Sequence, residues 1–169
     1  MKAHSVYSRI SVLLLAGIML AGCGYQLRGS ASLPQVMSVT YIQGMRPYSE
    51  LVTDFSRALS TRNIEVTTDA DSATAILTIS GNNFEKLVQS VDSAGNVLEY
   101  EIRQTISFSV SDPDRKVLLP EQSLTLSRDF LYTSTDVLAK AREEKLVRRT
   151  LQKNLVSLAM LRIAALENK

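Results

Sequence analysis

The chain has 169 residues, enough for a domain with a sizeable core, with 19 basic and 17 acidic side chains but one cysteine and one histidine. One cysteine excludes a disulfide within the chain, and one histidine with one cysteine cannot form a His/Cys zinc site. The small net charge of +2 does not predict a nucleic-acid-binding surface.

The first 22 residues have the three parts of a secretory signal. Lys2 and Arg9 supply positive charge, residues 10–20 form an apolar run broken only by a serine and a glycine, and small residues precede Cys23. The run is shorter than the roughly 20 residues of a membrane-spanning helix, which argues against a transmembrane anchor. We therefore predict that residues 1–22 are removed.

The segment Leu20-Ala21-Gly22-Cys23 resembles the lipobox of bacterial lipoproteins. This resemblance implies cleavage before Cys23, acylation of its sulfur and acylation of the new amine. Each buried methylene contributes about 0.8 kcal/mol, so several chains on one residue hold a protein firmly on a membrane. Because glycine and not aspartate follows Cys23, the resemblance implies the outer membrane, with the domain facing the periplasm.

The processed chain would carry little catalytic chemistry. His4 leaves with the signal, which excludes Cys-His and Ser-His catalysis, and the motifs S-x-x-K and G-x-S-x-G and the Gly-rich phosphate loops do not occur. A carboxylate hydrolase remains possible, because Glu99 and Glu101 would share a strand face, but such a pair is more typical of a solvated face. We therefore predict no enzyme activity, no cofactor and no metal.

The first half of the mature chain predicts a tether and then a single domain. Residues 23–35, with glycine, proline and small polar residues, form the tether, and the domain covers 36–169. Residues 36–43 have the composition of a strand. Apolar residues at helical spacing predict a helix over about 48–62. The stretch 64–74, rich in threonine and aspartate, is expected to be a short strand or a loop.

Two long strands joined by a tight turn are predicted next. Residues 75–91 are extended, with a bulge at 81–83, and residues 92–96 form a hairpin turn. Residues 98–110 then alternate apolar and polar side chains, interrupted only by Gln104. This alternation is typical of an antiparallel strand with one wet face.

A third long strand and a long helix complete the domain. Residues 116–132 are predicted to be a strand, and Pro120 indicates an edge or a bulge there. Cap residues at 133–136 precede a helix from 137 to about 166. Two amphipathic helices can cover the dry face of such a sheet, so the sequence predicts an α+β two-layer sandwich with both helices on one face.

The last helix has an unusual distribution of charge. Residues 140–169 hold eight basic and three acidic groups, whereas 23–139 hold nine basic and fourteen acidic groups. A positive helix on a negative body can bind phosphates, although the same stripe also suits a solvated helix face. Residues 155–166 are apolar nearly all round, which indicates either a partner surface or burial in a corner of the core. The cations of the stripe are Arg142, Lys145, Arg149 and Lys153.

A series of short motifs, in this order, resembles the LptE family of LPS-assembly lipoproteins and covers nearly the whole mature chain. The motifs are Cys23-Gly24-Tyr25-Gln26-Leu27-Arg28-Gly29, Leu33-Pro34, Arg46-Pro47-Tyr48-Ser49, Gly95-Asn96-Val97-Leu98-Glu99-Tyr100 and Leu138-Ala139-Lys140. The resemblance implies two helices packed on one face of a four-stranded, mostly antiparallel sheet. It also implies a 1:1 complex with the LptD β-barrel, which the lipoprotein plugs and helps to assemble, and binding of lipopolysaccharide during its delivery to the outer leaflet.

The resemblance also implies functional residues. Lys140 matches a basic position associated with lipopolysaccharide binding, whereas the turn around Ser93, where the family has its other basic residue, contains no Lys or Arg. The predicted lipopolysaccharide-binding residues are Lys140, Arg142, Lys145, Arg149 and Lys153. The predicted barrel contacts are Phe84, Tyr100, Leu155, Leu158 and Leu161.

A different class of function is left open by the sequence. The chain could be an autonomous lipid-binding lipoprotein of the periplasmic face, without a permanent barrel partner. That function would require an apolar cavity between the helices and the sheet.

Overall fold

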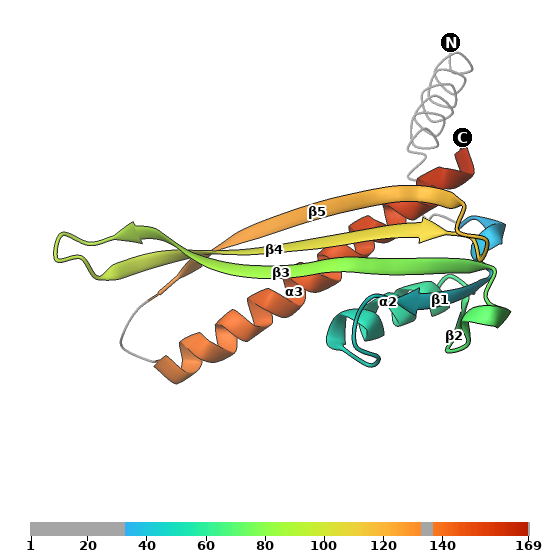
Figure 1. Ribbon diagram of the computed structural model, residues 1–169. Coiled ribbons are helices and arrows are strands. Elements are labelled where there is room, and N and C mark those ends of the chain that lie inside the picture. The colour runs from blue at the N-terminus through green and yellow to red at the C-terminus, as the bar shows by residue number, and fades with distance from the viewer. Residues whose placement is uncertain (1–32, 133–136, 169) are drawn as a thin grey trace, which may run out of the picture. The chain divides into compact units, whose positions relative to one another are not determined.

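The computed structural model describes residues 33–132 and 137–168 (Figure 1). The predicted signal, Cys23 and most of the predicted tether lie outside the described residues, as do the predicted cap residues 133–136.

The described domain has one five-stranded sheet, in the order β2-β1-β3-β4-β5, with two α-helices on one side of it (Figure 1). Both β2 and β3 run parallel to β1, whereas β3, β4 and β5 are antiparallel. The strands are β1 Val39–Gln43, β2 Glu65–Thr67, β3 Ala75–Val91, β4 Val97–Ser111 and β5 Val117–Leu131. The α-helices are α2 Glu50–Ser60 and α3 Val137–Ala164, and short 3-10 turns cover Gln35–Met37 (η1), Ala70–Ser72 (η2) and Ala165–Asn168 (η3).

The α+β class is confirmed, but the expected number of four strands is wrong by one. The fifth strand is β2, three residues that pair in register with β1 within the segment predicted as a short strand or loop. The first predicted strand also begins later than expected, at Val39, because Pro34 leads into a 3-10 turn.

Helix α2 is shorter at both ends than the predicted range of 48–62. Tyr48 has φ +62°, a left-handed conformation that cannot belong to the helix. Ser49 is the N-cap, and its hydroxyl accepts a hydrogen bond from the Val52 N–H at 3.4 Å. Beyond the C-terminus, Asn63 is again left-handed, with φ +61°.

Strand β4 has the predicted dry and wet faces from Ile102 onward, whereas Leu98 of the same apolar row is 46% exposed. Ile102, Ile106, Phe108 and Val110 are fully buried toward the helices, and Gln104 in the same row is also buried. The other face carries rows of hydroxyls that meet across strands, with Thr105 and Thr125 oxygens 2.9 Å apart and Ser107 bonded to Ser123 at 3.3 Å.

The irregular positions of the sheet also follow the sequence. The register between β3 and β4 shifts between Ile79 and Gly81, immediately before the predicted bulge at 81–83, whose residues pair regularly with β4. Strand β5 is an edge strand with a register shift beside Pro120. Proline is tolerated there because an edge strand does not need every backbone N–H for pairing.

The two helices differ greatly in length, and this difference shapes the dry face of the sheet. Helix α3 has 28 residues and extends about 42 Å, whereas α2 has 11 residues and extends about 16 Å. The main core lies where both helices meet the sheet. A smaller cluster lies under the N-terminal half of α3 alone. Its buried residues are Ile102, Phe130, Val147 and Leu151.

The β3–β4 hairpin extends past the N-terminal end of α3 (Figure 1). Val88, Val91 and Leu98 near its end are 57%, 53% and 46% exposed. The predicted turn is present, and the Asp92 carboxylate accepts hydrogen bonds from the backbone and side chain of Asn96. These bonds hold the pKa of Asp92 below its ordinary value of 3.8.

Candidate functional site

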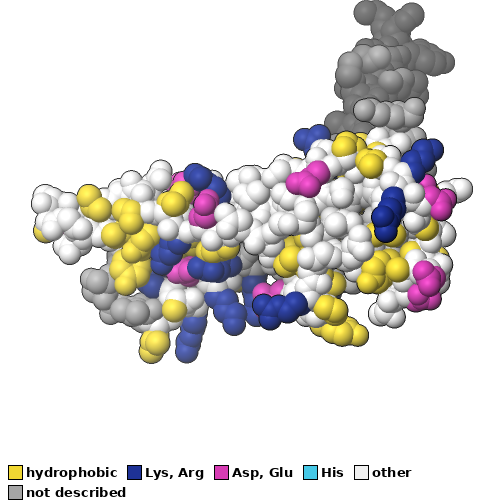
Figure 2. All heavy atoms as spheres, viewed as in Figure 1, with side chains coloured by type: hydrophobic (Ala, Val, Ile, Leu, Met, Phe, Trp, Pro, Cys, Tyr) yellow, Lys and Arg dark blue, Asp and Glu magenta, His cyan; other side chains and the backbone are white. Residues whose placement is uncertain are grey.

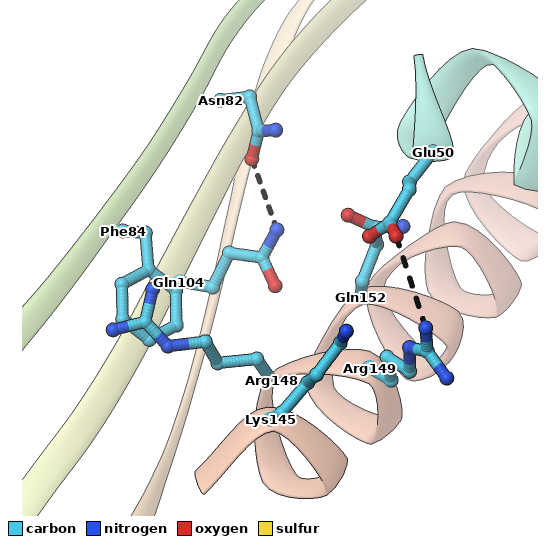
Figure 3. Close-up of a pocket in the computed structure, with 8 residues that line it drawn as sticks. All are labelled: Glu50, Asn82, Phe84, Gln104, Lys145, Arg148, Arg149 and Gln152. Carbon is cyan, nitrogen blue, oxygen red and sulfur yellow. Dashed lines mark hydrogen bonds and ion pairs between the residues drawn. The ribbon is translucent and has the colours of Figure 1, made fainter. Parts of the chain in front are cut away.

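A hollow of about 320 Å³ lies between helix α3, the first turn of α2 and strands β3 and β4. It exists because α2 begins only at Glu50, so that α3 is the only helix of the described residues that covers this part of the sheet. We call it the α3 trough (Figure 3). Its lining residues are Glu50, Asn82, Phe84, Gln104, Lys145, Arg148, Arg149 and Gln152.

Three cations of α3 line one wall of the trough, but they are held differently. The Arg148 guanidinium stacks on the Phe84 ring, 3.4 Å from its centroid, and binds Glu144 at 2.6 Å. Arg149 approaches Glu50 only at 4.0 Å, and both side chains are more than half exposed, so this pair is weak. Lys145 makes no ion pair with any described residue. Arg148 is therefore fixed, whereas Lys145 and Arg149 can turn to a ligand.

The floor of the trough is a buried carboxamide. Gln104 is 4% exposed, and its Nε2 donates to the Asn82 Oδ1 at 2.9 Å. Its Oε1 has no hydrogen-bond partner among the described residues. Figure 3 shows this oxygen and the Lys145 ammonium directed into the same space.

An aromatic cluster with two lysines adjoins the trough toward the hairpin. The Lys86 ammonium lies 4.1 Å from the Tyr100 ring centroid and 2.7 Å from the Glu144 carboxylate. Tyr132 packs edge-on against Tyr100, with centroids 5.6 Å apart, and Lys140 lies 5.4 Å from the Phe130 ring centroid. Figure 2 shows Lys and Arg side chains gathered over the N-terminal half of α3, beside apolar side chains of the hairpin.

Glu144 joins the two parts of this surface, because it accepts hydrogen bonds from both Lys86 and Arg148. Burial by itself would raise the pKa of this carboxyl, but the bonds from the two cations outweigh burial and hold the pKa below its ordinary value of 4.5. The carboxylate is therefore charged at neutral pH and ties α3 to β3.

The structure places the five predicted lipopolysaccharide-binding residues in different surroundings. Lys145 and Arg149 line the trough, and Arg149 and Lys153 border a second hollow with Asp54 and Arg57. Lys140 lies over the aromatic cluster and pairs with Glu143 at 2.9 Å. Arg142 is exposed and borders neither hollow. Their role in binding stays a prediction.

Sequence reasoning missed three residues of this surface, namely Lys86, Gln104 and Arg148. The i, i+4 spacing of Glu144 and Arg148 could have indicated that Arg148 is anchored. Gln104 was noticed only as a break in an apolar row, and nothing in the sequence connects Lys86 to α3.

The predicted barrel contacts divide into exposed and buried residues. Leu158 and Leu161 are 38% and 47% exposed, and Phe84 and Tyr100 are half-buried at the trough and the aromatic cluster. Leu155 is fully buried in the main core, so its side chain is not available to a partner in this structure. The predicted lipid anchor, Cys23, lies outside the described residues.

The candidate carboxylates of a hydrolase lie on the wet face of β4. A hydrogen bond from Ser127 and the adjacent Arg103 hold the pKa of Glu101 below its ordinary value of 4.5, and Glu99 accepts a bond from Ser90 at 3.3 Å. The lowered pKa of Glu101 is the opposite of the raised pKa that a general acid needs.

Among the described residues, no three His, Cys, Asp or Glu side chains come close enough to hold a metal ion. No helix in the described ranges is both long and apolar enough to cross a bilayer. A further hollow of about 570 Å³ lies between β1, β2 and the start of α2 and is lined by uncharged residues, so it offers no cation to a phosphate.

Comparisons with known proteins give a consistent result. A family model described as LptE, lipopolysaccharide-assembly, matches residues 37–163. The chain is 27% identical over 146 residues to the LPS-assembly lipoprotein LptE of Photorhabdus laumondii, covering 85% of this chain and 79% of that protein. It is 26% identical over 143 residues to the protein of the same name in Pectobacterium atrosepticum, covering 83% and 76%. An NMR structure of an uncharacterized lipoprotein B from Nitrosomonas europaea matches with a TM-score of 0.72 and 26% identity, covering 86% of this chain and 93% of that one.

Proposed function

The chain belongs to the LptE family of lipopolysaccharide-assembly lipoproteins, and we propose that it plugs the LptD β-barrel, assists the assembly of that barrel and binds lipopolysaccharide during delivery to the outer leaflet. The observation that carries this proposal is the family match over 37–163, which spans both helices and all five strands. The protein acts without catalysis, by fitting its surfaces to the barrel and to the glycolipid.

The proposed location follows from the N-terminal sequence. Acyl chains on Cys23 anchor the protein in the outer membrane, and the domain faces the periplasm. Replacement of Cys23 by serine should release the protein from the membrane fraction, and its continued sedimentation with outer membranes would contradict the proposed anchor.

Lipopolysaccharide binding is supported by the surface around the N-terminal half of α3. Phosphates bind Lys and Arg by charge-assisted hydrogen bonds, and Lys145 and Arg149 are the cations with the weakest internal pairing at the trough. The neighbouring aromatic cluster, with exposed apolar residues on the hairpin, gives an amphipathic ligand both charged and apolar contacts.

The plug role is supported by the wet face of the sheet. Its centre consists of small hydroxyl side chains, including Thr105, Ser107, Ser123 and Thr125, which leave the surface polar but nearly uncharged. The lumen of a large outer-membrane barrel is polar and must be blocked to stay sealed. A polar sheet face suits such an interior better than an apolar one.

The alternative of an autonomous lipid carrier finds less support. It requires an apolar cavity between the helices and the sheet, whereas that space is filled by the main core. Phe55 of α2, Phe108 of β4 and Ile163 of α3 are all fully buried there. The uncharged hollow of about 570 Å³ is lined by β1, β2, α2 and the segments next to them, with no residue of α3 or of the three long strands, so it does not lie between both helices and the sheet.

Capture of the tagged lipoprotein from detergent-solubilised outer membranes tests the partnership. We expect a large β-barrel protein to be recovered in an equal molar amount. Recovery of the lipoprotein without such a barrel would contradict the proposal.

Lipopolysaccharide binding can be tested with a matched pair of double variants of the full lipoprotein. Lys145→Ser with Arg149→Ser should weaken binding about tenfold or more, because two charge-assisted contacts are lost. Arg115→Asn with Lys116→Ser removes the same charge in the β4–β5 turn and should leave binding unchanged. Equal binding by the two double variants at physiological salt would show that the α3 stripe is only a solvated face.

A further inference from the structure

The floor of the α3 trough contains a hydrogen-bond acceptor that the fold leaves unused. Gln104 occupies a position of β4 whose neighbours in the same row, Ile102 and Ile106, are fully buried and apolar. Its Oε1 is buried without a partner in the described part of the chain. A buried polar atom left in this way destabilises a protein by about 1–3 kcal/mol, so an apolar side chain would stabilise the fold better. The arrangement suits a ligand that supplies the missing donor.

The unused acceptor restricts what can occupy the floor of the trough. A carbonyl oxygen accepts but does not donate, so it can bind a hydroxyl or an N–H but not an ionised phosphate oxygen. The Gln104 Nε2 is already engaged with Asn82, which fixes the direction of the oxygen toward the trough (Figure 3).

The α3 wall of the trough favours a second, negatively charged group on the ligand. Lys145 and Arg149 present positive charge beside the Gln104 oxygen, and Arg148 covers the Phe84 ring, which removes an apolar face from the site. Glu50 of α2, 4.0 Å from Arg149, repels a phosphate from its own side and accepts hydroxyls. The ligand therefore needs a hydroxyl at the floor and an anion against α3.

The size of the trough limits how much of a ligand enters it. A volume of about 320 Å³ corresponds to about ten water molecules of liquid volume. This is the scale of one sugar ring with its phosphate, and acyl chains would remain outside, toward the aromatic cluster and the hairpin.

We propose that the α3 trough binds a phosphorylated sugar, with a sugar hydroxyl donating to the Gln104 Oε1 and the phosphate held by Lys145 and Arg149. This inference deepens the proposed function and rests on it where the sugar phosphate belongs to the headgroup of a glycolipid. A free sugar phosphate has the same chemistry, and the two sources are separated by competition.

The test uses the full lipoprotein in non-ionic detergent, titrated with glucose 1-phosphate, inorganic phosphate and glucose by calorimetry. Glucose 1-phosphate should bind more tightly than either glucose or inorganic phosphate. Gln104→Met keeps the side-chain volume and should weaken glucose 1-phosphate binding about tenfold, the value of one buried hydrogen bond, without changing phosphate binding. Lys145→Ser with Arg149→Ser should weaken both phosphate and sugar phosphate.

A second measurement separates recognition from a purely structural role of Gln104. Gln104→Met removes the unsatisfied oxygen together with the hydrogen bond to Asn82, whereas Asn82→Ala breaks the same hydrogen bond and leaves both polar atoms of the Gln104 side chain without a partner. The free energy of unfolding of Gln104→Met should therefore exceed that of Asn82→Ala. A lower value would assign Gln104 to the fold and overturn the proposal. Equal affinity of the wild type for glucose 1-phosphate and inorganic phosphate would also overturn it, because the trough would then bind any anion.

Competition with purified lipopolysaccharide identifies the source. Displacement of glucose 1-phosphate assigns the site to the glycolipid headgroup, and simultaneous binding assigns it to a free sugar phosphate. If the wild type binds lipopolysaccharide and recovers the barrel but does not bind glucose 1-phosphate, the sugar-phosphate site fails while the proposed function stands.

Discussion

Gly44→Ala is expected to destabilise the domain by about 2–5 kcal/mol, far more than the same change at Gly95. Gly44 follows β1 and has φ +94°, a conformation that favours glycine. A Cβ added there would lie 2.2 Å from the Ile79 carbonyl oxygen, although Cβ atoms almost never approach another heavy atom within 3.0 Å. The backbone would therefore have to move by about 0.8 Å, at the point where β3 begins its bulge.

The expected magnitude combines two effects. A left-handed conformation costs an alanine about 1–2 kcal/mol, and the forced shift of a packed strand adds about 1–3 kcal/mol. Gly95 is the matched control, because it has φ +85° in the hairpin turn but nothing within 4 Å of an added Cβ. Gly95→Ala should therefore show the first effect alone.

Urea denaturation of the wild type and both variants, followed by far-UV circular dichroism, measures the two losses. We expect Gly44→Ala to exceed Gly95→Ala by about 1–3 kcal/mol in free energy of unfolding. Equal losses would refute the reasoning, since they would show that the contact with β3 relaxes without cost. Capture of the barrel by the Gly95→Ala variant should match the wild type.

Three further predictions concern the core, the ion-pair network and the partner surface. Phe108→Ala should lower the free energy of unfolding by about 3–5 kcal/mol, because Phe108 is fully buried against Phe55; a loss below 1 kcal/mol in urea denaturation would contradict this packing. Since the folded-state pKa of Glu144 is depressed, its contribution to stability is present above the ordinary pKa of 4.5 and is lost as the pH falls through the lower folded-state pKa. The melting temperature of the wild type should therefore fall more steeply in acid than that of Glu144→Gln. At neutral pH the variant should be less stable than the wild type by about 1–2 kcal/mol. Parallel curves of melting temperature against pH would show that the ionisation of Glu144 does not contribute to stability. Leu158→Ser with Leu161→Ser should lower the amount of barrel protein that is captured with the lipoprotein. The free energy of unfolding should change by less than about 1 kcal/mol per residue. Undiminished recovery of the barrel would show that these leucines do not belong to the interface.

Much of the fold could be predicted because the relevant signals are local. The alternation along β4 identifies its dry face residue by residue, since side chains of a strand point to opposite faces in turn. Pro120 indicated the edge strand because proline cannot donate a ladder hydrogen bond. The cations of α3 fall on one face through helical spacing alone.

The remaining features depend on contacts between distant segments. Strand β2 has three residues and no clear pattern, and it is a strand because Val39 pairs with Glu65 across the sheet. The α3 trough joins Gln104 to side chains more than 40 residues away on α3, and its extent is set by where α2 begins. Leu155 was expected on the surface, but both helices and the sheet enclose it.

Helix α3 packs on only part of the long strands, so the sheet has two levels of local stability. Under α3, the strands are held by buried side chains and by Glu144, whereas neither of the two described α-helices packs on the hairpin end (Figure 1). Backbone amides near Val88 and Leu98 should therefore exchange with solvent by local opening, and those near Ile106 only by unfolding of the whole domain. The hairpin can thus change its shape against a partner or a lipid while the rest of the sheet keeps its structure.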